Sequence, residues 1–297
     1  MSEVSNARPP KPRRRWLRLS LVALTTLVVL AAGLLRCAPP RPDLAKIFAG
    51  RTPPTYHRYT VLDREIFAAE VGPADAPPVL LVHGSPGSWE DALNTLSDPQ
   101  LETRAHLISV DRPGFGNSGA GQLETSLERQ AAMLLGVLAQ SAPGRKAIVV
   151  GHSLGGPIAA RMAMDGAQQV AGLVLVAASI DPGLERTTWY QKAARWPIVR
   201  WIVPNILALA NDEIRPLHGE LEKMMPLWAS IHVPVIVIQG DTDGLVPKAN
   251  ADFAEHMLTG AQVDMMRVPK QGHMIPWERP ELIRQAILDL LDKTEKN

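Results

Sequence analysis

One stretch constrains the fold of this chain more than any other: an apolar β-branched run that meets a glycine turn and then a helix-like segment. Residues 147–150 read Ala-Ile-Val-Val, residues 151–155 read Gly-His-Ser-Leu-Gly, and residues 158–163 are mostly small and apolar. A strand that turns sharply into a helix, with a serine between two glycines, is typical of a nucleophilic serine. The five-residue pattern alone is weak, but its position between a strand and a helix favours a functional role for Ser153.

The geometry of such a turn explains its residue types. The serine adopts strained backbone angles, which cost on the order of 1–3 kcal/mol. Gly151 and Gly155 come too close together for side chains, so both lack a Cβ. The helix that begins near Leu154 directs its first N–H groups at the point where an oxyanion would form. We therefore expect the Leu154 N–H to be one oxyanion donor.

A serine hydroxyl also needs an adjacent base, because it is a poor nucleophile near neutral pH. His273 follows Gly272 in the loop between the last predicted strand and the last predicted helix. A histidine beside a flexible glycine at that place suits a base that reaches over the sheet. We therefore predict His273 as the base, with an ordinary surface histidine as the alternative.

The carboxylate that orients this base is expected after the predicted strand at residues 234–239. Two aspartates compete in the loop that follows, Asp241 and Asp243. Asp243 stands three residues past Gly240 and should project from the loop tip. Asp241 lies nearer the strand end, where an aspartate more often accepts backbone N–H groups of a turn. We favour Asp243 and keep Asp241 as the alternative.

A second oxyanion donor is expected from the His-Gly-Ser-Pro-Gly loop at residues 83–87. Gly84 permits a close backbone approach, and the N–H of Ser85 is the natural donor. The alternative for this loop is a plain turn. Losing one such donor typically costs about 2.7–4 kcal/mol of transition-state stabilisation.

Strand-like and helix-like segments alternate from Val79 onward, which predicts an α/β fold: a mostly parallel sheet with helices on both faces. A hairpin of residues 56–62 and 65–71 comes first. Further strands are expected at 79–82, 105–110, 146–150, 172–177, 234–239 and 262–268, and helices near 88–96, 123–140, 154–165, 248–257 and 279–291.

Residues 181–230 interrupt the alternation and predict a small helical cap over the strand ends. Its aromatic residues should mostly pack the cap onto the body, or else line an apolar acyl pocket or touch a membrane: Trp189, Tyr190, Trp196 and Trp201.

The N-terminal region predicts a membrane anchor. Residues 1–18 are basic, and residues 19–35 carry no charge and are just long enough to span a bilayer core as a helix. Because the basic residues lie mainly before the span, the N-terminus should be cytoplasmic and the catalytic domain extracytoplasmic. The alternative is a cleaved signal peptide and a secreted protein. Residues 36–54 form a Pro-rich linker to the domain at 55–297.

Charge and cysteine content exclude some classes. The chain has a net charge of +1, yet residues 1–42 hold eight Lys/Arg and one Glu, so the remainder is mildly acidic. A mildly acidic body offers no basic footprint for nucleic acid. The single cysteine, Cys37, can form neither an internal disulfide nor a cysteine-based metal cluster.

Five motifs in their expected order resemble those of the α/β-hydrolase superfamily, particularly its lid-bearing branch. They are residues 83–89, 111–118 (Asp-Arg-Pro-Gly-Phe-Gly-Asn-Ser), 151–156, 240–247 and 272–273, and they lie within residues 56–292. The resemblance implies an α/β-hydrolase fold with Ser153 as nucleophile, His273 as base and Asp243 as its orienting acid. It also implies that Asp111 and Arg112 hold a loop together.

Departures from relatives narrow the expected chemistry. Haloalkane dehalogenases and epoxide hydrolases of this superfamily use an aspartate where this chain has Ser153. The His-Gly-Gly-Gly of hormone-sensitive-lipase relatives is absent, and Ser85 replaces the middle glycine found in prolyl aminopeptidase relatives. We therefore expect a serine hydrolase for a small ester-like substrate, with no metal or organic cofactor. Alternatives are amide or carbon–carbon bond hydrolysis, acyl transfer, perhydrolysis, or a non-catalytic ligand-binding module.

Overall fold

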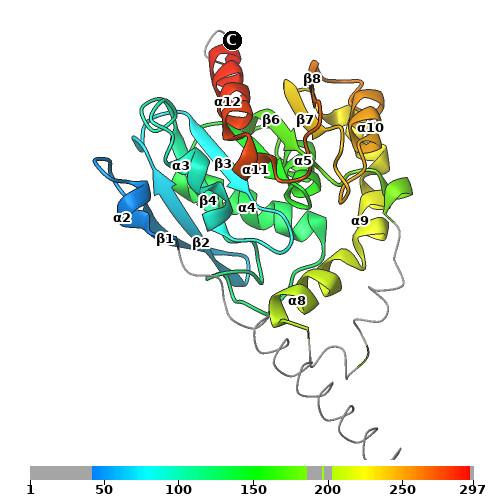
Figure 1. The fold of residues 1–297 in the computed structure, drawn as a ribbon, viewed down its shortest axis with the longest axis horizontal. Coiled ribbons are helices and arrows are strands. Elements are labelled where there is room, and N and C mark those ends of the chain that lie inside the picture. Colours follow the sequence, from blue (N-terminus) through cyan, green and yellow to red (C-terminus); the bar gives the residue numbers. More distant parts are fainter. Residues whose placement is uncertain (1–41, 186–195, 197–202, 295–297) are drawn as a thin grey trace, which may run out of the picture. The chain divides into compact units, whose positions relative to one another are not determined.

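Apolar strands in the described part of the chain build one eight-stranded sheet with the order β1-β2-β4-β3-β5-β6-β7-β8 (Figure 1). The strands are β1 Thr55–Val61, β2 Arg64–Val71, β3 Pro78–Val82, β4 His106–Val110, β5 Ala147–His152, β6 Val170–Val176, β7 Val235–Gly240 and β8 Val263–Val268. β1 pairs antiparallel with β2, and β2 with β4, whereas the other pairings are parallel. The predicted hairpin, the six strands after it and the mostly parallel sheet are confirmed.

The central strands are buried on both faces. Every residue of β3, β4 and β7 is buried, and their Val, Ile and Leu runs are what a parallel sheet covered on both sides requires. Successive side chains point to opposite faces of a strand. Leu80 and Val149 therefore join one core, and Val79 and Ile148 join the other.

Helices cover each of these two cores (Figure 1). One face carries α4 Leu127–Ser141, α5 Gly155–Asp165 and α10 Ala249–Met257. The opposite face carries the 3-10 helix η1 Trp89–Ala92 with α3 Leu93–Leu96, α11 Ile275–Glu278 and α12 Pro280–Thr294. α4 begins where the Ser126 hydroxyl accepts the N–H of Arg129, a cap that satisfies one free donor of the first turn. The five predicted helices are confirmed to within a few residues at their ends.

Between β6 and β7 the chain is largely helical in its described part. After the short 3-10 helix η2 Pro182–Leu184 come α8 Asn205–Ile214, α9 Leu217–Met224 and the 3-10 helix η3 Met225–Ser230. Trp228 of η3 is fully buried in the core below α5. Trp196 is 69 % exposed, so this side chain is not one of those that pack onto the body. The other aromatic residues expected to pack the cap lie outside the described residues.

The computed structural model describes residues 42–185, 196 and 203–294. Of these, residues 42–185 and 209–294 belong to one compact unit. The membrane span predicted at 19–35 lies outside the described residues and stays a prediction. No helix in the described part is both long and apolar enough to cross a membrane.

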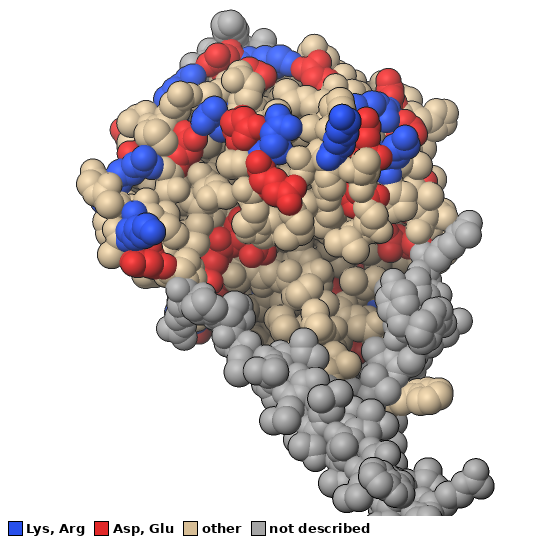
Figure 2. Space-filling view, viewed as in Figure 1, with Lys and Arg blue, Asp and Glu red and all other residues tan. Residues whose placement is uncertain are grey.

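Charged side chains on the described surface are of mixed sign. On the face that Figure 2 shows, acidic and basic residues are interspersed. Several pair directly, such as Arg284 with Asp98 at 3.1 Å and Lys293 with Asp264 at 2.6 Å. Ion pairs at the surface contribute about 0–1 kcal/mol each to stability. The fold therefore depends on its two apolar cores more than on its surface charges.

Candidate active site

Ser153 occupies the sharp turn between β5 and α5. Its φ of 53° lies in the left-handed region, which is strained for a residue with a side chain. A Cβ on Gly151 would lie 2.3 Å from the carbonyl oxygen of Gly155, and one on Gly155 would lie 2.3 Å from that of Val82. Gly151 is therefore required by the close approach to Gly155 that the sequence suggested, and Gly155 by its approach to β3, which the sequence did not predict. The turn is held by a 2.9 Å hydrogen bond from the Ser153 N–H to the carbonyl of Val176.

His273 and Asp243 come together from the loops after β8 and β7. The His273 Nδ1–H donates to Asp243 Oδ2 at 2.8 Å, with side-chain exposures of 10 % and 0 %. The other oxygen, Asp243 Oδ1, accepts the N–H groups of Leu245 and Val246, both at 2.8 Å. These contacts leave the Nε2 atom of the His273 ring as the one available for another partner.

The backbone-accepting role expected of Asp241 is a wrong prediction. Asp243 performs it, because its Oδ1 meets the N–H groups two and three residues further on, the geometry of an Asx turn. Asp241 is exposed. One aspartate thus both closes the turn and contacts His273, so the loop conformation fixes the position of the carboxylate.

Hydrogen bonds keep the Asp243 carboxyl ionised. Burial alone would raise its pKa, but the hydrogen bond from His273 and the N–H groups of Val246 and Leu245 outweigh burial. The pKa of Asp243 is therefore below its ordinary value. A carboxylate that stays charged at neutral pH can stabilise a positive charge on the His273 ring.

His152 connects the turn of Ser153 to the loop of His273. Its Nε2–H donates to the carbonyl oxygen of His273 at 3.2 Å, and the two rings lie 4.8 Å apart. Burial, followed by the neighbouring His273, lowers the pKa of His152 to about 4. His152 is therefore neutral at pH 7 and acts as a hydrogen-bond donor to the loop. The sequence placed it only within the glycine turn, with no signal for this contact.

The loop after β3 lies directly against the serine. A Cβ on Gly84 would stand 2.9 Å from the Cβ of Ser153, so a glycine is needed at this position. In the described part of the chain, no protein acceptor takes the N–H of Ser85 or that of Leu154. Their role as oxyanion donors stays a prediction.

Arg112 and Asp111 organise the surroundings of this loop, as the resemblance implied. Asp111 accepts the N–H groups of Trp89 and Asn117, and Arg112 donates to the carbonyl of Gly84 at 2.7 Å. The buried partner of Arg112, Glu213 on α8, is a contact that the sequence did not predict. The two residues are 101 positions apart, and no local pattern joins them.

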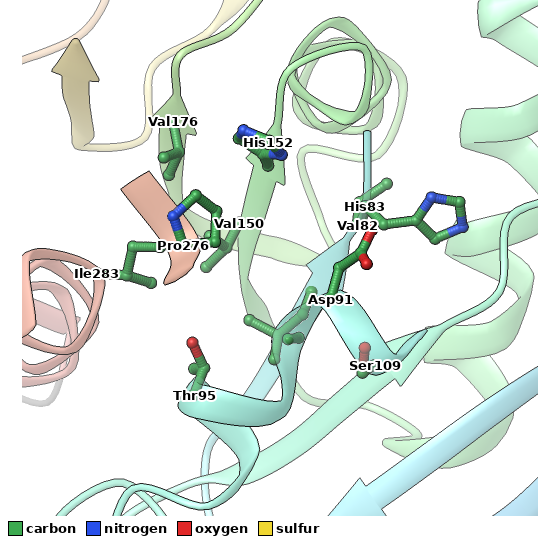
Figure 3. A pocket seen from close by; sticks show the side chains of 12 residues that line it. Val82, His83, Asp91, Thr95, Ser109, Val150, His152, Val176, Pro276 and Ile283 are labelled. Carbon is green, nitrogen blue, oxygen red and sulfur yellow. The ribbon is translucent and has the colours of Figure 1, made fainter. Parts of the chain in front are cut away.

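A cavity of about 40 Å³ lies beneath His152 (Figure 3). Its wall combines apolar residues of β3, β5 and β6 with the polar side chains of Asp91 and Thr95. Burial raises the pKa of Asp91 to about 6. The hydrogen bond from the Ser88 N–H lowers this pKa, and the nearby Glu90 and Asp111 carboxylates raise it further. A mainly apolar cavity of this size, with a few polar groups in its wall, is large enough for a water molecule. No cluster of three or more potential metal ligands occurs among the described residues.

The chain is similar in sequence to bacterial acyltransferase and esterase proteins. It is 24 % identical over 252 residues to the dihydrolipoyllysine-residue acetyltransferase component of an acetoin cleaving system from Pseudomonas putida, which covers 75 % of this chain and 66 % of that one. It is 35 % identical over 157 residues to the pimeloyl-[acyl-carrier protein] methyl ester esterase of Vibrio vulnificus, covering 52 % and 53 %. The chain thus spans about half to two thirds of the length of these relatives.

Solved structures and family models agree on the fold. The crystal structure of a membrane phospholipase A, described as a bacterial virulence factor, has a TM-score of 0.66 at 22 % identity and covers 96 % of this chain and 100 % of that one. At this identity the likeness shows the fold alone. The model of the alpha/beta hydrolase family matches residues 79–286, which is more than half of the chain. With this match and the sheet order described above, the chain belongs to the alpha/beta hydrolase family.

Proposed function

We propose that the chain is a serine hydrolase that cleaves carboxylic esters through an acyl-enzyme. The observation that carries the proposal is the hydrogen bond from His273 to Asp243. A second hydrogen bond, from His152 to the His273 carbonyl, joins the loop of His273 to the turn of Ser153. Membership of the alpha/beta hydrolase family supports it, as does similarity to a Vibrio methyl ester esterase.

The proposed reaction follows the general logic of a serine–histidine–aspartate triad. The Ser153 hydroxyl attacks the ester carbonyl while His273 takes its proton, and Asp243 stabilises the imidazolium that forms. The N–H groups of Ser85 and Leu154 bind the negative oxygen of the tetrahedral intermediate. His273 then protonates the leaving alcohol, and water activated by the same histidine releases the acid from Ser153. No metal or organic cofactor takes part in these steps.

The segment at residues 181–230 would act as the lid of this enzyme and shape its acyl pocket. α8, α9 and η3 follow β6, and the N–H of Ser179, just after β6, donates to the Ser153 carbonyl at 3.2 Å. A lid in this position would meet the substrate at the carboxyl ends of the strands, where ligands bind in open α/β sheets.

Labelling by a fluorophosphonate probe tests the proposal. Fluorophosphonates react with serines that an adjacent base activates. We expect purified residues 43–297 to take up one label, which peptide mass spectrometry should locate at Ser153. A Ser153→Ala variant should take up none, and Ser230→Ala, which removes an exposed serine of η3, should label as the wild type does. Absence of labelling in the wild type, or labelling at another serine, would contradict the proposal.

The proposal includes attachment to a membrane through residues 19–35, with the catalytic domain outside the cytoplasm. The uncharged span after a basic segment supports it. We expect the full chain to stay with membranes after alkaline carbonate extraction, whereas residues 43–297 should be recovered in the supernatant. A reporter fused after Asn297 that remains cytoplasmic would contradict the orientation.

A further inference from the structure

A buried ion pair links α8 to the loop that carries the predicted oxyanion donor Ser85. Arg112, which follows β4, meets Glu213 in a two-pronged contact of 2.5 Å from Nη1 to Oε1 and 3.1 Å from Nη2 to Oε2. The side chains are 0 % and 2 % exposed. Burying two charges is expensive even when they are paired, so such a pair is weak evidence for a purely stabilising role.

The same guanidinium group reaches the oxyanion loop. Arg112 Nη2 donates to the carbonyl oxygen of Gly84 at 2.7 Å, and His83 Nδ1–H donates to that same oxygen at 2.7 Å. The backbone N–H of Arg112 donates to His83 Nε2 at 2.9 Å, which fixes the neutral form of the ring. Burial and the charge of Arg112 hold the pKa of His83 well below its usual range, so the ring remains neutral.

Because the peptide bond is planar, these contacts also set the direction of the Ser85 N–H. The carbonyl of Gly84 and the N–H of Ser85 belong to one planar trans peptide group, in which they point in opposite directions. Two donors that fix the carbonyl oxygen therefore also fix the direction of the Ser85 N–H. Arg112 can hold that oxygen only while its own position is set, and Glu213 binds both of its terminal nitrogens.

We propose that Glu213 is a positioning residue, which aims the Ser85 N–H at the oxyanion by holding Arg112 against Gly84. The inference rests on the proposed serine hydrolase and deepens it. Oxyanion stabilisation then depends on a side chain from the segment between β6 and β7, so the placement of α8 and the reactivity of Ser153 are coupled. Gln130, which accepts from Arg112 Nη1 at 2.9 Å, supports the same guanidinium from α4.

A Glu213→Gln variant tests the proposal by its effect on kcat. A glutamine keeps the volume of the side chain but offers only one acceptor to the two nitrogens of Arg112. We expect kcat for 4-nitrophenyl acetate to fall by about 10- to 100-fold with little change in KM, short of the loss of about 10²–10³ that removal of an oxyanion donor causes. The inhibition constant of 1,1,1-trifluoroheptan-2-one, whose adduct places an oxyanion in the same site, should rise by the same factor.

Glu220→Gln is the matched control. Glu220 lies on α9 and also binds the body, accepting the N–H of Leu127 at 3.0 Å, but among the described residues it makes no hydrogen bond or ion pair with the oxyanion loop. It should keep the wild-type kcat and inhibition constant. An equal loss in Glu220→Gln would overturn the proposal, because it would show that any loosening of the segment lowers activity.

If Glu213→Gln does not fold, an Arg112→Lys variant tests the same proposal. A lysine keeps a positive charge beside Glu213, so no buried charge is left unpaired, but it lacks the fork that reaches Gly84 and Glu213 together. We expect the same pattern of reduced kcat, weaker ketone inhibition and nearly unchanged KM. A folded variant with wild-type kcat and inhibition constant would overturn the proposal. A wild-type chain that hydrolyses no ester would instead contradict the proposed function.

Discussion

Replacing Ser153 with alanine should lower kcat for ester hydrolysis by about 10⁶, the size of the loss when the serine nucleophile is removed from a triad protease. In the proposed mechanism the loss is this large because the other groups of the site act through the serine. His273 would have no proton to accept without it, and oxyanion donors alone retain only a small part of the rate enhancement. Steady-state hydrolysis of 4-nitrophenyl butyrate by residues 43–297 would measure the effect.

The fold of the Ser153→Ala variant should survive. Both serine and alanine carry a Cβ, so the strain at a φ of 53° is similar, and the hydrogen bond from the backbone N–H to Val176 is kept. Thermal unfolding should therefore occur near the wild-type temperature. A Ser153→Ala protein with wild-type unfolding and undiminished hydrolysis would assign the activity to another group and exclude the acyl-enzyme mechanism.

Local sequence patterns predicted most of the sheet because each strand carries its own signal. β5 begins with a β-branched run that leads into Gly151, and the hairpin of β1 and β2 turns at Leu62 and Asp63, next to the predicted Asp63 and Arg64. The sharp turn at Ser153 could be predicted for the same reason, because the two glycines it requires lie within five residues of sequence. These features depend on neighbours in the chain and need no knowledge of long-range packing.

Contacts between distant segments could not be predicted in this way. Arg112 was expected only to hold a loop, and its partner Glu213 is buried by the packing of α8, which no local pattern specifies. The same holds for the hydrogen bond from His152 to the loop of His273. Two charged residues far apart in the sequence can be identified as a buried ion pair only from the fold that removes both from water.

The geometry of the turn explains the misassigned role of Asp241. Asp241 and Asp243 stand two residues apart and have the same chemistry, so the sequence suggested a division of labour between turn and histidine. In the structure the turn winds so that Asp243 Oδ1 meets the N–H groups of Leu245 and Val246, and its Oδ2 faces His273. One carboxylate has enough acceptor positions for both.

An Asp243→Asn variant should lower kcat by about 10⁴, as the equivalent substitution does in serine proteases. An asparagine side chain has no charge to stabilise the imidazolium. Its NH2 group would face His273 Nδ1, which favours the ring form whose Nδ1 accepts and whose Nε2 carries the proton. That form cannot take a proton from Ser153. Asparagine Oδ1 can still accept from Leu245 and Val246, so the turn should be kept.

Asp241→Asn is the matched control, because it makes the same chemical change two residues away at an exposed position. It should retain kcat within about twofold, since surface substitutions rarely change stability by more than about 0.5 kcal/mol. Comparing the two variants over pH 5–9 separates the roles, because the Asp243 carboxyl has a lowered pKa and is ionised throughout that range. The defect of Asp243→Asn should therefore persist at every pH in the series. If Asp241→Asn were the inactive variant and Asp243→Asn active, the orienting acid would be the other aspartate, and the contact between Asp243 and His273 would have only a structural role.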